Sequence, residues 1–91
     1  MQRRFDRIRW TRGRVAHIVR HGVAPEEAYE ALLDEHNHMR RTRAGRYLLY
    51  GRTGAGRPLV LVLVDEGRRI AGLVTARDAS GAERRAFFGG S

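Results

Sequence analysis

Two histidines and two arginines share one face of a helix that the sequence predicts near the N-terminus. Placed at 100° steps along residues 12–21, they fill one uninterrupted arc: Arg14, His17, Arg20 and His21. A neutral imidazole can take the proton of a sugar 2′-hydroxyl, and guanidinium groups can hold a phosphate and the charge that develops on it. Such a face has the groups needed to cleave RNA without a metal. The alternative for His21, beside Gly22 in the last turn, is a bond to an orphan carbonyl.

Further arginines are expected beside this face. Arg77 follows the last predicted strand, Arg52 ends an earlier one, and Arg85 lies in a helix near the C-terminus. We expect one of the two histidines to lie within about 6–10 Å of Arg77 or Arg52, because one phosphate must touch both groups. The alternative for Arg77 is a surface ion pair with Asp78 or Asp34.

No metal, cofactor or nucleotide site is expected. The sequence has no cysteine, which excludes a disulfide framework, a thiolate zinc site and a cysteine nucleophile. His17 with His21, and His36 with His38, have spacings that would suit zinc, but no HExxH pattern accompanies them. The glycines of residues 51–56 precede no helix, so they are typical of a hairpin and not of a dinucleotide loop.

The chain is short and strongly basic. Its 91 residues suffice for one domain with a modest core, and 18 arginines against 10 acidic residues give a net charge of +8. This balance favours a polyanion such as RNA, or an acidic protein, as the partner; the alternative is a solvated basic surface. The longest apolar run, Leu59 to Val64, is far below the ~20 residues of a membrane span, and no secretory signal follows the basic N-terminus. We therefore expect a cytoplasmic protein with no membrane partner.

Helices are predicted at both ends of the chain. Thr11 is an N-cap for a helix over residues 12–21, and Pro25 begins a second helix that ends near residues 34–36. Ser80 and Glu83 form a capping box for a last helix over about residues 81–88. The side chains expected to be buried are Val15, Ala16, Ile18 and Val19 in the first helix, Ala28, Tyr29, Ala31 and Leu32 in the second, and Ala82, Ala86 and Phe87 or Phe88 in the last.

The segments outside the helices are predicted as strands, an arm and a tail. Residues 3–10 are expected to be a short strand or an extended arm, with residues 1–7 as the arm of a single domain, and residues 89–91 a frayed tail. Strands are predicted at residues 37–41, 46–52, 58–65 and 69–76, and the short turns between them require antiparallel pairing. The strand at 58–65 is nearly all apolar, so we expect it at the centre, covered on both faces.

These elements define an α+β architecture: two N-terminal helices, an antiparallel four-stranded meander and a C-terminal helix. We expect the helices on one face of the sheet and a substrate, a partner or solvent on the other. Tyr47 and Leu49 are expected on that other face, where a partner would bind them.

An ordered set of short segments resembles the BrnT family of bacterial toxins over about residues 8–88. The matching segments are Trp10 before the first helix, Arg20-His21-Gly22-Val23 followed by Glu26-Glu27-Ala28, the strand Arg46 to Arg52, and Thr75-Ala76-Arg77 before Glu83-Arg84-Arg85.

The resemblance implies a compact ribonuclease toxin with a RelE-like fold, which a cognate antitoxin, expected to be of the ribbon-helix-helix type, neutralises. On this reading RNA is cut by 2′-hydroxyl attack with His21 or His17 as the base, and Arg20, Arg77 and Arg85 bind the phosphate. The alternative is a non-catalytic basic module that binds nucleic acid or an acidic partner protein.

Overall fold

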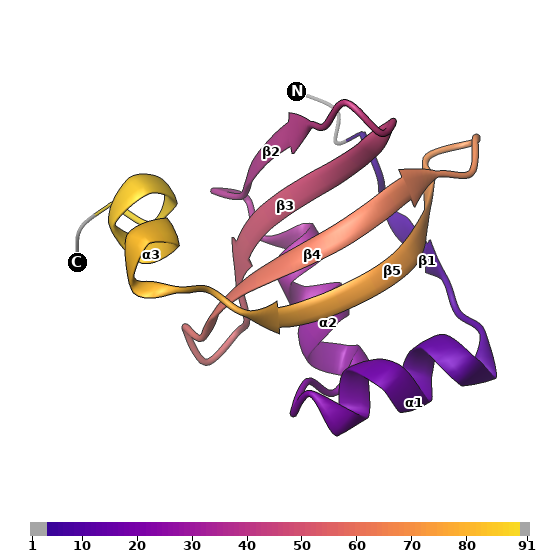
Figure 1. The fold of residues 1–91 in the computed structure, drawn as a ribbon, viewed down its shortest axis with the longest axis horizontal. Coiled ribbons are helices and arrows are strands. Elements are labelled where there is room, and N and C mark those ends of the chain that lie inside the picture. The colour runs from indigo at the N-terminus through magenta and orange to yellow at the C-terminus, as the bar shows by residue number, and fades with distance from the viewer. Residues whose placement is uncertain (1–3, 90–91) are drawn as a thin grey trace.

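Five strands form one mixed sheet in the computed structural model, which describes residues 4–89 (Figure 1). The strands are β1 (Arg7–Arg9), β2 (His38–Arg41), β3 (Arg46–Arg52), β4 (Pro58–Asp65) and β5 (Ile70–Asp78), and the helices are α1 (Arg12–Arg20), α2 (Pro25–Leu33) and α3 (Gly81–Phe87). The sheet order is β1-β5-β4-β3-β2. β2, β3, β4 and β5 pair antiparallel in chain order, which confirms the predicted meander. The connections between them are short enough for hairpins, which require antiparallel pairing.

The N-terminal segment contains a short strand, one of the two alternatives predicted for residues 3–10. β1 pairs parallel with β5, with Arg7 opposite Ile70, and makes the sheet five-stranded and mixed. Phe5 and Ile8 are buried in the core, at 2% and 8% exposure. The strand is only three residues long, and its partner lies at the other end of the chain, so no local sequence pattern marks the pairing. Residues 1–3 and 90–91 of the predicted arm and tail lie outside the described residues.

α1 and α2 begin where the sequence predicts, but α1 ends at Arg20 and not at residue 21, and α2 ends at Leu33 and not near residues 34–36. The Thr11 hydroxyl accepts from the backbone N–H of Arg14, and Gly22, directly after the end of α1, has a φ of +81° that favours glycine. Pro25 lies in the first turn of α2, where its missing N–H costs nothing. None of the helices in residues 4–89 has the length and apolar character that crossing a membrane requires.

The two helices bury fewer side chains than expected. α2 covers one face of the sheet with Ala28, Ala31 and Leu32, while Tyr29 is 40% exposed and does not join them. In α1 only Ile18 is buried, and Val19 is 53% exposed. The reason is position: α1 runs beside the outer edge of β5 and not across the face of the sheet (Figure 1).

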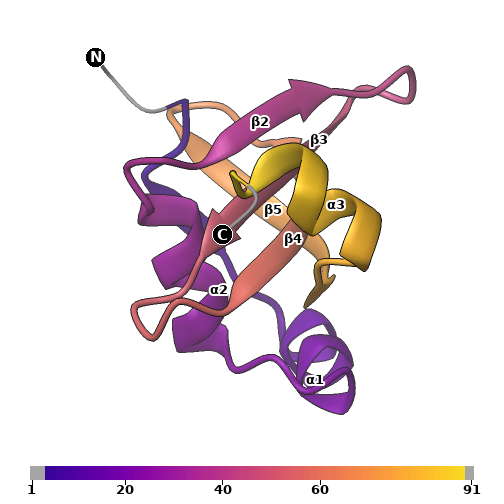
Figure 2. The ribbon, with the colours of Figure 1, turned by 90° about the vertical axis from the view of Figure 1, so that its left-hand side faces the viewer.

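α3 lies on the face of the sheet opposite α2 (Figure 2), which corrects the prediction that all helices share one face. Its Phe87 ring stacks on Tyr50 with centroids 3.9 Å apart, and Tyr50 points away from the core side of β3. Ala82 and Ala86 are exposed, contrary to expectation. The core side is already filled by α2, so the apolar surface that remains for α3 is the one around Tyr50.

Tyr47 and Leu49 face the core, at 7% and 2% exposure, and not the uncovered side where a partner was expected to bind them. They pack there with Leu61 and Leu63 of the central strand β4. Both alternating sets of β3 are apolar, so the period alone cannot tell which set faces the helices.

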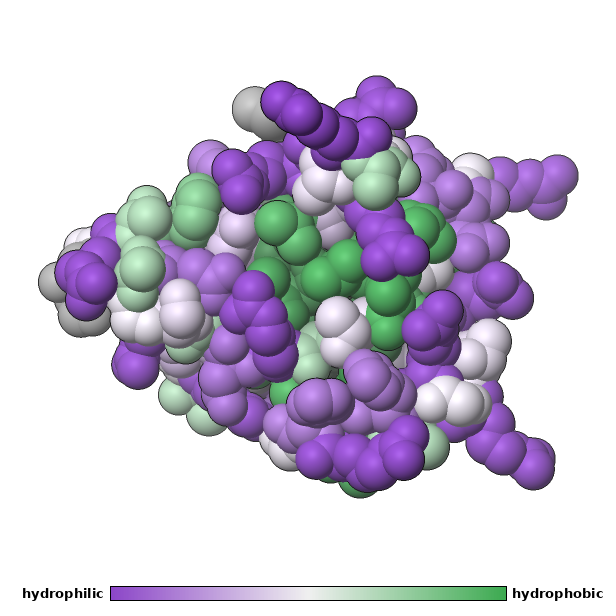
Figure 3. All heavy atoms as spheres, in the orientation of Figure 1, coloured by the Kyte–Doolittle hydropathy of each residue, from purple (hydrophilic) through white to green (hydrophobic). Residues whose placement is uncertain are grey.

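We call the side of β2 to β5 opposite α2, outside α3, the open face. Residues in register on an antiparallel sheet point to the same side. One row of this face is Arg40, Leu48, Val62 and Thr75, and the next is Arg46, Val64 and Gly72. Figure 3 shows an apolar patch in the middle, surrounded by hydrophilic side chains. Val62 and Val64 are half-buried, so β4 is covered on both faces only in part.

Gly51 fixes how closely α2 approaches β3. A Cβ added there would collide with the carbonyl oxygen of Ala31, whereas one at Gly54 in the following loop would make ordinary contact with Glu30 at 3.5 Å. We predict that Gly51→Ala lowers the free energy of unfolding by about 1–3 kcal/mol because helix and sheet must separate. Gly54→Ala should change it by less than about 0.5 kcal/mol. Urea denaturation followed by circular dichroism measures both; equal effects would contradict this account of the close approach.

Candidate functional site

The outer edge of β5 is shared between a strand and a helix. β1 covers this edge only as far as Gly72, and the pairing of β5 with β4 then skips Val74 at a bulge. α1 lies along the remaining part of the edge. An Arg14 Nη1 donates to the carbonyl oxygen of Val74 at 3.3 Å, and His17 Nε2 lies 3.0 Å from Thr75 Oγ1. Two side chains of the predicted polar arc therefore fasten α1 to β5.

His17 and His21 are brought together, as their spacing predicts. Their ring centroids are 4.7 Å apart, with the planes at 62°. His17 is half-buried and lies against Thr75, while His21 is exposed. The predicted alternative for His21 was a side-chain bond to an orphan carbonyl. The bond to the carbonyl of Ile18 comes instead from the backbone N–H of His21, and the ring lies beside His17.

Arg77 is held by Glu83, the carboxylate that was predicted to form a capping box with Ser80. Its guanidinium bonds both oxygens of Glu83, at 2.7 and 2.9 Å, and one nitrogen also donates to the carbonyl of Asp78. The alternative predicted for Arg77 was an ion pair with Asp78 or Asp34, but its carboxylate partner is Glu83, and the Asp78 carboxylate bonds Arg57. The contact with Arg77, helped by the backbone N–H of Ser80, lowers the pKa of Glu83 to about 2. Arg77 lies two residues beyond Thr75 on the same side of β5, in register with Val60, and is solvent-exposed.

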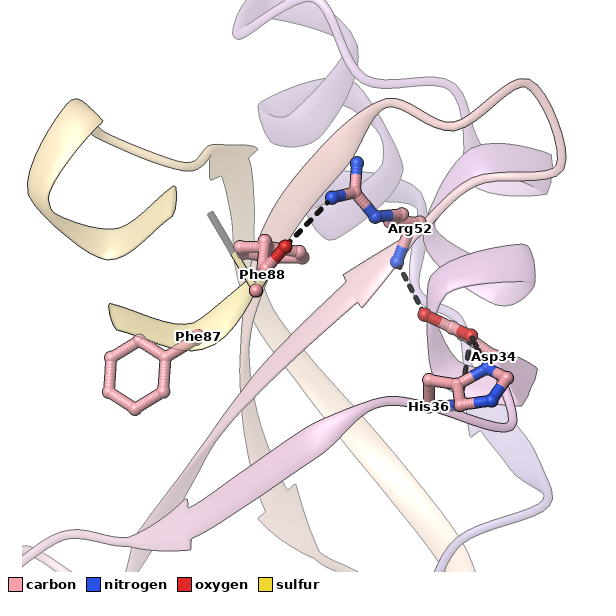
Figure 4. Close-up of a pocket in the computed structure, with 6 residues that line it drawn as sticks. Asp34, His36, Arg52, Phe87 and Phe88 are labelled. Atoms are coloured by element: carbon pink, nitrogen blue, oxygen red, sulfur yellow. Dashed lines mark hydrogen bonds and ion pairs between the residues drawn. The ribbon is translucent and has the colours of Figure 1, made fainter. Parts of the chain in front are cut away.

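Arg52 lies at the α3 end of β3 and not at the edge of β5. Its backbone N–H donates to Asp34 at 2.8 Å, and its guanidinium donates to the carbonyls of Gly56 and Phe88 at 3.0 and 3.1 Å. Figure 4 shows it directed at Phe88, beside a cavity of about 360 Å³ that His36 also lines. These contacts tie the β3–β4 hairpin to the end of α3.

Arg20 and Arg85 are both solvent-exposed. Arg85 folds back along α3, so that a Cβ at Gly81 would lie 3.6 Å from its Nη1. The structure thus places Arg14 against Val74, His17 against Thr75 and His21 beside His17, while Arg77 lies two residues beyond Thr75 on β5. The separation of about 6–10 Å expected between one of these histidines and Arg77 or Arg52 stays a prediction.

Two residues that matter to this arrangement were not singled out from the sequence. Thr75 belongs to the Thr75-Ala76-Arg77 segment, but the alternating pattern of β5 could not show that a bulge at Val74 brings its hydroxyl to His17 of α1.

Arg57 donates to Asp78, to Glu27 and to the carbonyl of Gly22, at 2.8–3.1 Å. The backbone N–H of Ala24 and then Arg57 lower the pKa of Glu27. Arg57 lowers the pKa of Asp78, and that carboxylate, followed by Glu27, raises the pKa of the guanidinium. No local pattern distinguishes Arg57 from the other arginines.

Within residues 4–89, no three histidine, aspartate or glutamate side chains gather as a set of metal ligands. The fold and the site define a small basic α+β domain with a mixed five-stranded sheet and a pair of histidines at one sheet edge. Comparison with family models and with curated proteins finds no match to this chain.

The lowered pKa of Glu83 makes part of the stability depend on pH. A carboxylate whose pKa is lower in the folded state stabilises above its unfolded pKa and loses that contribution as the pH falls toward the folded value. We predict that wild-type protein loses about 1 kcal/mol more than Glu83→Gln between pH 5 and pH 2, a figure reduced for solvent screening. Urea denaturation across this range measures the difference. Glu26→Gln, at an exposed position of α2, is the control; an equal change in both variants would contradict a role for the Arg77–Glu83 pair.

Proposed function

We propose that this protein is a metal-independent ribonuclease that binds single-stranded RNA at the outer edge of β5. The observation that carries the proposal is the hydrogen bond between His17 and Thr75, which fixes an imidazole beside a second imidazole and among arginines. His17 is oriented by a hydroxyl, as a general base must be oriented by a neighbouring group. Arg14 and Arg20 supply positive charge on the same helix.

The proposed reaction divides the proton transfers between the two histidines. With Nε2–H of His17 donating to Thr75 Oγ1, the lone pair of Nδ1 takes the proton of a ribose 2′-hydroxyl. The 2′-oxygen then attacks the adjacent phosphorus, and the bond from phosphorus to the 5′-oxygen breaks. His21 in its protonated form gives its proton to that leaving oxygen. The products are a 2′,3′-cyclic phosphate and a 5′-hydroxyl, and the arginines stabilise the charge on the phosphate oxygens.

The resemblance to BrnT toxins supports the same reaction and adds a partner. His21 and Arg77 lie in segments that carry the resemblance. We therefore propose that the ribonuclease is the toxin of a toxin–antitoxin pair and that a cognate antitoxin of the ribbon-helix-helix type neutralises it.

Cleavage of a labelled RNA in the presence of EDTA tests the ribonuclease. We predict that His17→Ala and His21→Ala each lower the rate by about 10²-fold or more, the usual contribution of a positioned acid or base. His36→Ala is the matched control, because the His36 side chain is 92% exposed on the loop after α2. The products of the wild-type reaction should carry a 2′,3′-cyclic phosphate. Full activity in both variants, or products with a 3′-hydroxyl, would remove the histidine pair from the mechanism.

One observation favours the alternative, a non-catalytic basic module. The bond between Arg77 and Glu83 compensates the charge of the arginine closest to Thr75 along β5, which leaves fewer unpaired guanidinium groups for a reacting phosphate. If the wild-type protein binds RNA but does not cleave it, the non-catalytic basic module replaces the ribonuclease as the proposed function.

The open face suits an acidic, partly apolar segment of the antitoxin. Its apolar patch includes Leu48 and Val62, and Arg40 lies in the same row with an exposed side chain. We predict that Arg40→Glu weakens binding of the proposed antitoxin by 10-fold or more, because a repulsive charge replaces an attractive one. Arg43→Glu, with the same charge change in the turn before β3, should cost less than 3-fold. Isothermal titration calorimetry measures both, and equal losses would place the antitoxin elsewhere.

A further inference from the structure

We infer that a second phosphate of the bound RNA occupies a pocket on the open face, formed by Arg14 of α1 and Arg46 of β3. This inference rests on the proposed function for the identity of its ligand and adds a subsite that does not touch the reacting atoms. The pocket has a volume of about 160 Å³, and Arg9, Val64, Glu66 and Gly72 also line it. A water molecule occupies roughly 30 Å³ in the liquid, so the space admits a group as large as a phosphate.

The charges around the pocket are unbalanced. Glu66 pairs with Arg9, with 3.3 Å between the guanidinium and the carboxylate. Arg14 donates to a neutral carbonyl, and neither Arg14 nor Arg46 forms an ion pair with any residue of the described chain. Two uncompensated guanidinium groups from different elements therefore face one concave space. Guanidinium groups bind phosphate oxygens through paired N–H donors and keep their charge at every physiological pH.

The pocket already holds one oxyanion of the protein itself. A Cβ added at Gly72 would collide with the Glu66 carboxylate and lie 2.9 Å from Val64, so that carboxylate sits directly over the glycine. The Glu66 carboxylate fits there because Gly72 has no side chain. Because Glu66 lies on the exposed turn after β4, it can leave the space when a stronger anion enters.

The position of the pocket relates it to the histidine pair. Arg14 lines the pocket and also bonds the carbonyl of Val74, the residue next to Thr75. Thr75 is the residue that orients His17. One RNA strand lying along β5 would therefore place one phosphate at His17 and a neighbouring one between Arg14 and Arg46.

The experiment measures binding of a fluorescein-labelled, fully 2′-O-methylated single-stranded RNA, which lacks the attacking hydroxyl, by fluorescence anisotropy across a range of salt concentrations. We expect Arg46→Gln to weaken binding by 5-fold or more and to reduce the slope of log affinity against log salt by about 0.7, the value for one phosphate contact on a single strand. Arg43→Gln removes the same charge from the turn before β3 and should change affinity by less than 2-fold. Glu66→Gln should tighten binding by 2-fold or more, because the competing carboxylate is gone.

Several results would overturn the pocket. Equal losses in Arg46→Gln and Arg43→Gln would show that only the general positive field of the protein matters. An unchanged affinity in Glu66→Gln would show that the carboxylate does not compete with RNA. Binding of a polyglutamate peptide that depends on Arg46, while RNA binding does not, would assign the pocket to an acidic protein.

Cleavage assays keep this inference separate from the proposed function. If unmodified RNA is cleaved, Arg46→Gln should raise KM with kcat nearly unchanged, since the pocket holds substrate away from the reacting bond. If no cleavage occurs but Arg46→Gln and Glu66→Gln act on binding as expected, the ribonuclease fails and the phosphate pocket stands. If cleavage depends on His17 and the Arg46 variant behaves like the Arg43 control, the ribonuclease stands and the pocket fails.

Discussion

A single half-buried guanidinium, that of Arg57, joins the elements on which the histidine pair depends. It bonds Asp78 at the end of β5, Glu27 in the first turn of α2, and the carbonyl of Gly22 between the two N-terminal helices. Hydrogen bonds with charged partners on both sides are stronger than neutral ones. Without this cation, Glu27 and Asp78 would repel each other, as the opposing effect of Asp78 on the pKa of Glu27 indicates. The C-terminal end of α1, where the histidines lie, is thus positioned by Arg57 together with the contacts of Arg14 and His17 to β5, since only Ile18 of that helix is buried.

Local rules of backbone chemistry predicted most of the elements but not how they are layered. Thr11, Pro25 and Ser80 mark helix starts because each satisfies, or does not need, a backbone donor that the first turn leaves unpaired. The parallel pairing of β1 and the placement of α3 depend on contacts between residues far apart in sequence. For α3, the deciding contact is the stack of Phe87 on Tyr50, and a strand with apolar residues on both sides offers no local sign of which side is covered.

The candidate site shows the same division. Helical spacing correctly brought His17 and His21 together, because residues four apart are neighbours on any helix. The hydroxyl of Thr75 was missed because its approach to α1 depends on the bulge at Val74. The capping box correctly identified the bond that the backbone N–H of Ser80 donates to Glu83, but the same carboxylate also accepts from Arg77, which the pattern could not show.

α2 covers one face of the sheet, and α3 covers only one end of the opposite face. The part that remains uncovered, the open face, is both apolar and positively charged. The open face has an apolar centre at Leu48 and Val62 and cations at its border, including Arg40 and Arg46. An RNA strand uses the cations and little of the apolar centre, because phosphates dominate its affinity. An amphipathic acidic segment contacts both the cations and the apolar centre. Burial of the apolar centre makes its free energy of binding more favourable, and RNA lacks this contribution. Under the proposed scheme, an antitoxin therefore displaces RNA from the arginines that both need, without having to reach the histidines themselves.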